Sequence, residues 1–139
     1  MLDLQHLFDG RQYHLNEVTG VPGIDLIVDF VGIDKFDYVQ IISNYDGSAT
    51  HTVKIELYDW DGAAWVDWDA NAGIEQAHTQ HSFWVPCGVN YVGTGADAGK
   101  VRVRFYHPAS GNASHDLYIE GVVLYNREFR LDHHWGPWR

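Results

Sequence analysis

Acidic and tryptophan side chains are concentrated in residues 59–69, where four Asp and three Trp occur within eleven positions. Two kinds of binding chemistry use such residues. Exposed Trp rings stack on the C–H faces of sugars, while nearby carboxylates accept hydrogen bonds from sugar hydroxyls. Carboxylates are also the ligands that calcium prefers. The candidate ligand-binding residues are therefore Trp60, Trp65, Trp68, Asp59 and Asp61.

The spacing of these aspartates does not fit a calcium-binding loop. An EF-hand loop needs oxygen ligands at alternate positions, a Gly at the sixth position and a Glu at the twelfth. Only the opening pair, Asp59 and Asp61, is present here. A third interpretation is a tight hairpin that reverses at Asp61-Gly62, with Trp rings packed on a sheet and Asp side chains forming the turn. We expect this hairpin; whether it also binds a glycan or a calcium ion stays open.

Histidine is frequent, with nine copies, but the copies are scattered along the sequence. They include His78 and His81 in an expected connection, His107 and His115 on either side of a turn, and His133 and His134 near the end. A zinc site needs several such ligands to converge. We expect solvated loop histidines, no metal site and no cofactor. Because no Ser-His-Asp motif or acid–base carboxylate pair can be singled out, the sequence predicts a protein that is not an enzyme.

The last fourteen residues, 126–139, combine arginine with aromatic side chains around a Gly-Pro break. Trp and Arg are the residue types that most often anchor protein interfaces. This tail either folds back as a final strand and cap or docks on another subunit. Residues 1–23 are expected to form an edge strand or an arm that reaches a neighbour. The candidate interface residues are Phe129, Arg130, Trp135, Trp138 and Arg139.

Composition excludes several classes of partner. The chain has 139 residues, enough for one domain with its own hydrophobic core. Its formal net charge of −10 argues against nucleic-acid binding, which depends on basic side chains that neutralise phosphates. The sequence shows neither a signal-peptide pattern nor an apolar stretch of membrane-spanning length, so we expect synthesis in a cytoplasm and no membrane contact. The single cysteine, Cys87, excludes an intramolecular disulfide.

Hydrophobic alternation predicts short β-strands and no helix. It is clearest in residues 52–58 and 100–106, where Val, Ile, Leu and Phe alternate with charged side chains. Residues 26–33, 38–42, 82–86 and 115–125 are further strands, with a bulge expected at Gly121, and residues 70–80 are a long connection. We expect residues 100–106 and 115–125 to pair as a hairpin, in which Arg102 or Arg104 faces Glu120.

Seven or eight short strands separated by turns are typical of an antiparallel β-sandwich. A jelly roll is the specific architecture we expect. The sandwich would occupy residues 24–125, between an N-terminal arm or edge strand, residues 1–23, and the C-terminal tail, residues 126–139.

The succession of residues 26–30, 52–60, 82–86, 101–107 and 117–124 resembles the small jelly-roll proteins that tailed bacteriophages carry on their particles, as head decoration, head-fibre or tail accessory proteins. The resemblance implies a virion structural protein, made in the host cytoplasm, that acts as a homo-oligomer and contacts other virion proteins. The same layout is similar to that of carbohydrate-binding modules, which implies glycan binding through Trp60, Trp65 and Trp68 as the alternative function.

Overall fold

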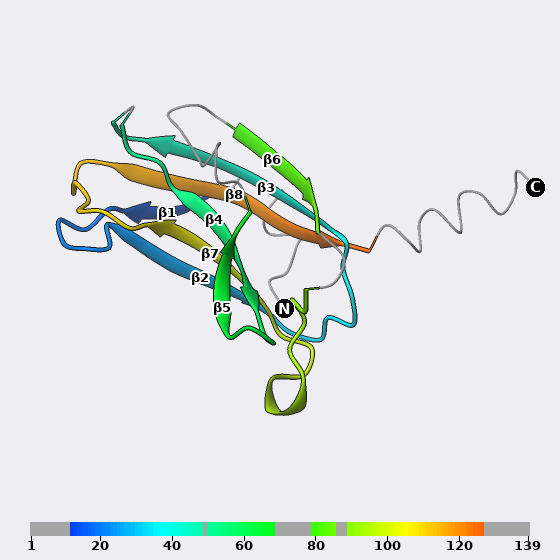
Figure 1. Ribbon diagram of the computed structural model, residues 1–139. Coiled ribbons are helices and arrows are strands. Elements are labelled where there is room, and N and C mark those ends of the chain that lie inside the picture. Colours follow the sequence, from blue (N-terminus) through cyan, green and yellow to red (C-terminus); the bar gives the residue numbers. More distant parts are fainter. Residues whose placement is uncertain (1–11, 49, 69–78, 86–88, 127–139) are drawn as a thin grey trace, which may run out of the picture.

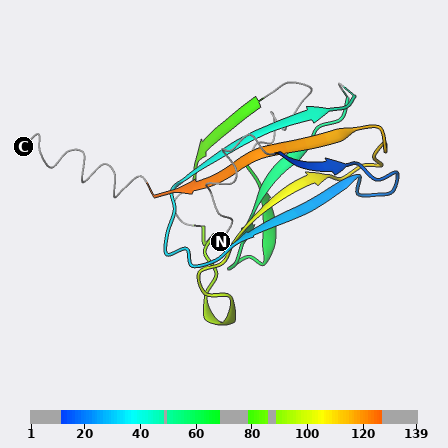
Figure 2. The ribbon, with the colours of Figure 1, turned by 180° about the vertical axis from the view of Figure 1, so that it is seen from behind.

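Two four-stranded antiparallel sheets stack on each other to form a β-sandwich (Figures 1 and 2). This computed structural model describes residues 12–48, 50–68, 79–85 and 89–126. The first sheet has the strand order β1 (Tyr13–Asn16), β8 (Asp116–Tyr125), β3 (Tyr38–Asp46), β6 (Thr79–Trp84). The second has the order β2 (Ile24–Phe30), β7 (Val101–His107), β4 (Lys54–Asp59), β5 (Ala64–Asp67). A short 3-10 turn, η2 (Gly95–Asp97), precedes β7. The expected all-β antiparallel sandwich is confirmed.

The core lies between the sheets and is built from the alternating residues that the sequence indicates. In β7, Val101, Val103 and Phe105 are fully buried while the intervening arginines face outward. The same alternation buries Val53, Ile55 and Leu57 at β4. Burying each such side chain contributes about 1.5–3 kcal/mol relative to leaving it in water, so these inward rows hold the two sheets together.

The hairpin expected between residues 100–106 and 115–125 does not form. Strand β7 lies between β2 and β4 in one sheet, and β8 lies between β1 and β3 in the other. The polar segment between them is therefore a crossing from sheet to sheet. Consequently Arg104 contacts Asp25 and Glu56 instead of Glu120. Both strands are central in their own sheets, and each already has a neighbour on both sides.

Other local predictions hold. The first described strand, β1, is an edge strand, and β4 and β5 form the expected hairpin, with Asp59 paired to Ala64. The bulge is present as well. Ile42 pairs with Gly121, while the next residue, Ser43, pairs with Ile119, so β8 has one extra residue at this point. The expected connection over residues 70–80 ends earlier, because β6 begins at Thr79.

Some expected features fall outside the described residues. They include Cys87, Asp69, His78, His133, His134 and the tail candidates Phe129, Arg130, Trp135, Trp138 and Arg139. Within the described ranges, no helix is long and apolar enough to cross a membrane.

Three connections meet at one end of the sandwich, on the left in Figure 1: β1 to β2, β3 to β4, and β7 to β8. Hydrogen bonds join the first and the last of these. The Gly23 N–H donates to the carbonyls of His107 and Ala109, and the Ser110 hydroxyl donates to the carbonyl of Thr19. This end of the molecule therefore brings together residues that are distant in sequence.

Candidate functional site

The outer face of the second sheet carries a group of aromatic and arginine side chains, here called the arginine–aromatic face. Strand register explains why they meet. Arg104 of β7 pairs with Glu56 of β4, and Tyr58 of β4 pairs with Trp65 of β5. Because side chains two residues apart share a face of a sheet, the outward residues of these strands form adjacent rows. The face consists of Tyr58, Trp60, Trp65, Arg102, Arg104 and Tyr106.

Arg104 is the best-anchored side chain on this face. Its guanidinium donates two hydrogen bonds to Asp25, with Nε–Oδ1 and Nη2–Oδ2 distances of 2.8 and 3.2 Å. It also lies over two rings, 3.6 Å from the centre of Tyr106 and 5.1 Å from that of Trp65. The planar guanidinium suits both the carboxylate and the rings. Arg104 therefore fixes the arrangement of its neighbours.

Arg102 repeats this arrangement one row away. Its guanidinium carbon lies 5.1 Å from the ring centre of Trp60 and 5.7 Å from that of Tyr58, and its Nε lies 3.2 Å from Oδ1 of Asp29. Tyr58 meets both tryptophans edge-on, with ring centres 5.0 Å from Trp60 and 5.1 Å from Trp65. The face is thus a continuous array of alternating rings and cations, half-exposed to solvent.

The five predicted ligand-binding residues do not all belong to this face. Trp60 and Trp65 do, but the Trp68 ring is turned inward and stacks on Phe83 with ring centres 5.2 Å apart. Trp68 therefore contributes to the core and offers no platform for a ligand.

Asp59 and Asp61 act as turn formers. Oδ1 of Asp59 accepts a hydrogen bond from the Asp61 N–H at 3.0 Å, and Oδ1 of Asp61 accepts one from the Asn90 side chain at 3.2 Å. Such side-chain bonds stabilise tight turns. In this arrangement the two carboxylates serve the β4–β5 turn, as the hairpin interpretation predicts.

Glu56 is buried beneath the arginine–aromatic face. Burial raises the pKa of its carboxyl group, and the nearby Arg104, with Nη1 3.4 Å from Oε2, opposes this effect in part. The Arg104 guanidinium therefore compensates a costly buried acid.

We expect Arg104→Ala to lower the free energy of unfolding by about 2 kcal/mol, because it removes charged hydrogen bonds and the cation that lies 3.4 Å from the Glu56 carboxylate. Arg104→Lys should recover only part of this loss, since an ammonium group lacks the planar fork. Urea unfolding followed by tryptophan fluorescence measures both. The more exposed Arg102→Ala is the control and should cost about 1 kcal/mol or less; equal losses for the two alanine variants would contradict this assignment.

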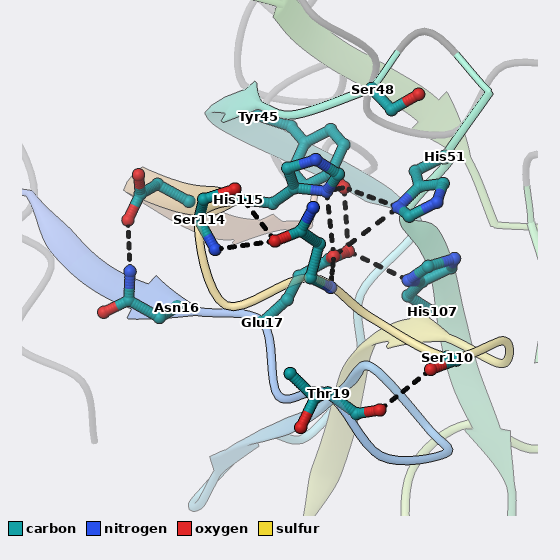
Figure 3. Close-up of polar contacts among 12 residues, drawn as sticks. Asn16, Glu17, Thr19, Tyr45, Ser48, His51, His107, Ser110, Ser114 and His115 are labelled. Atoms are coloured by element: carbon teal, nitrogen blue, oxygen red, sulfur yellow. Dashed lines mark hydrogen bonds and ion pairs between the residues drawn. The ribbon is translucent and has the colours of Figure 1, made fainter.

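A second group of polar residues gathers at the end of the sandwich where the three connections meet (Figure 3). Its centre is Glu17, whose side chain is fully buried. The carboxylate accepts hydrogen bonds from the Tyr45 hydroxyl at 2.7 Å and from the Asn112 backbone N–H at 2.8 Å. These donors fix its position between the sheets. We call Glu17, Tyr45, His51, His107 and His115 the Glu17 cluster.

Three imidazole rings present the same nitrogen, Nδ1, to this carboxylate (Figure 3). His107 Nδ1 lies 2.9 Å from Oε1, and the Nδ1 atoms of His115 and His51 lie 3.0 and 3.5 Å from Oε2. The His51 ring centre is 4.6 Å from that of His107 and 4.9 Å from that of His115. The prediction of solvated loop histidines is wrong for His107, which is 5% exposed.

The electrostatics of the cluster keep the glutamate ionised and the tyrosine neutral. Burial by itself raises the pKa of Glu17, but the hydrogen bonds from Asn112 and Tyr45 and the interactions with His107 and His115 lower it below its usual value. Burial and the adjacent carboxylate raise the pKa of Tyr45 well above its usual value. The cluster therefore contains one negative charge and one hydroxyl donor at neutral pH.

The strand pattern contains a signal that could have identified these residues. Each charged or imidazole residue lies two positions from an inward-facing apolar residue at the end of a strand. Glu17 follows Leu15, His51 precedes Val53, His107 follows Phe105 and His115 precedes Leu117. A period of two places each of them on the inward side. Extending the alternation past the last apolar residue would have predicted that all four side chains point inward.

An apolar cavity of about 290 Å³ opens between β2 and the strands β1 and β8. It is lined by Tyr13, Leu26, Ile27, Val28, Asp29, Ile119 and Val122. Asp29 is the one ionisable group besides the Tyr13 phenol in this lining, and it already pairs with Arg102. The cavity therefore lacks the convergent polar groups that catalysis requires.

Comparison with known protein families gives no matching family model, and no curated protein sequence matches this chain.

Proposed function

We propose that this chain is a non-enzymatic structural protein that acts by docking on protein surfaces, as a decoration or accessory protein of a tailed-bacteriophage particle. The observation that carries the proposal is the arginine–aromatic face. Tyr, Trp and Arg are the residues most enriched at the energetic centres of protein interfaces, and here six of them share one half-exposed sheet face. The first partner that we propose is a second copy of the chain.

Charge supports a partner of this kind. The whole chain has a formal charge of −10, so two copies repel each other over most of their surface. Lys54, Arg102 and Arg104 are three of the five basic residues in the described part of the chain, and all three lie on this sheet face. They are interspersed with Asp25, Asp29, Glu56 and Asp67. A face with both signs of charge can complement its own copy.

The topology is compatible with the proposal. Every connection between consecutive strands except β4 to β5 passes from one sheet to the other. Eight strands in two sheets with such crossings support assignment to the jelly rolls, an architecture that viral capsid domains and lectins share. The resemblance of the strand succession to small bacteriophage jelly-roll proteins favours the virion as the setting.

Glycan binding is the second candidate function. It is favoured by Tyr58, Trp60 and Trp65, three adjacent half-exposed rings with carboxylates nearby, which is the arrangement that stacks sugars. Against it, arginine side chains lie over the rings of all three. A sugar would have to displace those cations or use the opposite ring faces. Protein docking, in which arginine itself is a contact residue, requires no such displacement.

We expect the purified chain to form a dimer or larger oligomer in light scattering, and Trp65→Ala to shift it to monomer while its circular dichroism spectrum stays unchanged. Truncating Trp65 removes the ring on which Arg104 rests and leaves the core intact. Trp84→Ala is the matched control, because Trp84 is an exposed tryptophan on the first sheet, 53% accessible. It should leave the oligomer unchanged.

A chain lacking residues 126–139 completes the experiment. Oligomers that survive Trp65→Ala but dissociate on this truncation would assign the contact to the tail and overturn the role of the face. A monomer in every form would overturn self-association. A glycan array then tests the second candidate, which requires sugar binding that Trp65→Ala abolishes.

A further inference from the structure

We propose that Glu17, His51 and His107 bind a divalent zinc ion that ties the two sheets together at one end of the sandwich. Imidazole nitrogens and a carboxylate are donors that zinc prefers. The ligands come from the β1–β2 connection, the β3–β4 connection and the end of β7, and His115 lies beside them with Nδ1 3.0 Å from Oε2 of Glu17. A metal held by the three ligands would therefore link segments that are distant in sequence.

Three donor atoms lie close enough together to share one ion. Zinc–ligand bonds of about 2.0–2.2 Å place neighbouring donor atoms about 3.3 Å apart. The three Nδ1 atoms lie 2.9, 3.0 and 3.5 Å from the nearest Glu17 oxygens. Ligand atoms of Glu17, His51 and His107 all lie within 4.8 Å of one another. Small side-chain shifts suffice for these groups to share an ion.

The hydrogen bonds among the described residues leave one buried imidazole nitrogen of the cluster without a partner. A carboxylate has about four acceptor sites. Two are taken by the Asn112 N–H and the Tyr45 hydroxyl. The Tyr45 hydroxyl oxygen in turn lies 3.1 Å from Nδ1 of His115 and 3.4 Å from Nδ1 of His51. His115 makes a hydrogen bond to Oε2. The Nδ1 of His107 makes no hydrogen bond to any described group, although the side chain is only 6% exposed and the atom faces Oε1 from 2.9 Å. A cation shared with Glu17 and His51 would bind this nitrogen.

The surroundings suit a bound metal. Tyr45 and Asn112 hold the carboxylate in place by donating to its two oxygens, which is the support that ligating carboxylates commonly have. His107 and His115 are largely buried, whereas a quarter of the His51 side chain is exposed. His51 therefore lies on the path by which an ion would enter from solvent. Strong binding by N/O ligands is expected for zinc in preference to magnesium or calcium.

Titration of the full chain with zinc chloride, after removal of metals with a chelator, tests the proposal. We expect saturation at one ion per chain by isothermal titration calorimetry and a higher melting temperature with zinc. Cobalt in place of zinc should show the visible absorption of a tetrahedral complex. His51→Ala and His107→Ala should each weaken zinc binding by at least about tenfold. Because His107 is buried and its removal could impair folding, the more exposed His51→Ala is the decisive variant, with folding checked by circular dichroism.

The sequence supplies a matched control in His133 and His134, an adjacent pair outside the cluster that could bind zinc by itself. His133→Ala/His134→Ala should retain the one-ion stoichiometry and the affinity. Absence of saturable zinc binding to the wild-type chain would overturn the proposal. So would binding that persists in His51→Ala and His107→Ala, or binding that disappears in the tail double variant.

Discussion

Glu17→Ala is expected to lower the free energy of unfolding by about 4 kcal/mol, because removing one member of a buried charged network leaves its partners unpaired. The Tyr45 hydroxyl, the Asn112 N–H and the His115 imidazole all lose the carboxylate as a hydrogen-bond partner, and Tyr45 is completely buried. Urea unfolding followed by tryptophan fluorescence measures the loss. A chelator in the buffer removes any bound metal, so the unfolding measurement reports only the interactions among the protein's own residues.

Two further variants make the experiment specific. Glu17→Gln keeps the shape and one oxygen but places an amide N–H₂ against donors, so we expect a loss of about 2 kcal/mol. Glu120→Ala is the matched control, a glutamate on the outward side of β8 that accepts a surface hydrogen bond from Gln12. It should change stability by about 0.5 kcal/mol or less. Similar unfolding midpoints for Glu17→Ala and Glu120→Ala would contradict the central role of Glu17.

The pH dependence of this difference follows from the pKa of Glu17, which is lower in the folded chain than the usual 4.5. A carboxyl group of this kind stabilises the fold above its unfolded pKa and loses that contribution as the pH falls through its folded pKa. Glutamine does not titrate. The stability gap between the wild type and Glu17→Gln should therefore be full at neutral pH and narrow below about pH 4.5.

The sequence determines the faces of the strands more clearly than their partners. Alternation in residues 100–106 correctly predicts that Val103 and Phe105 point inward. This alternation does not indicate which strand lies beside β7. The prediction that β8 is its partner rests on closeness in sequence, and it is wrong. Central strands need a neighbour on each side, and in this fold those neighbours are β2 and β4. Partner choice depends on how whole sheets pack, which no single strand encodes.

For the Glu17 cluster too, the sequence predicts which side chains point inward but not which of them meet. The inward-facing Val103 and Phe105 predict that the His107 side chain also points inward. They do not predict which residues surround it, because Glu17 is 90 positions earlier in the chain. Convergence of the cluster depends on three connections meeting at one end of the sandwich (Figure 1). The arginine–aromatic face is likewise a product of register between β7, β4 and β5. Residue types predicted that Trp60 and Trp65 could bind a ligand, and only the register brought Arg102 and Arg104 over them.

Gly111→Ala is expected to cost about 3 kcal/mol, at the upper end for overpacking, because the new methyl group meets backbone that cannot rotate away. A Cβ on Gly111 would lie 2.8 Å from the Cα of Gly23 and 2.9 Å from the Cβ of Glu17, and closer still to the carbonyl oxygen of Val18. Relief requires the β1–β2 and β7–β8 connections to separate. That movement would also lengthen the hydrogen bond from Asn112 to Glu17, so the variant should disturb the cluster as well as the global stability.

Gly20→Ala is the matched control for this substitution. Gly20 lies in the β1–β2 connection, against which Gly111 packs, yet a Cβ on Gly20 would meet nothing within 4 Å. The unfolding midpoint of Gly20→Ala should therefore be unchanged or slightly raised. Gly23→Ala should resemble Gly111→Ala, since its Cβ would lie 2.7 Å from the Cα of Gly111. Once one methyl group has separated the two connections, the second meets less resistance. The double variant should therefore lose less than the sum of the single losses, as expected for contacting sites. Strict additivity would show that each clash is relieved locally, without movement of the two connections that hold Glu17.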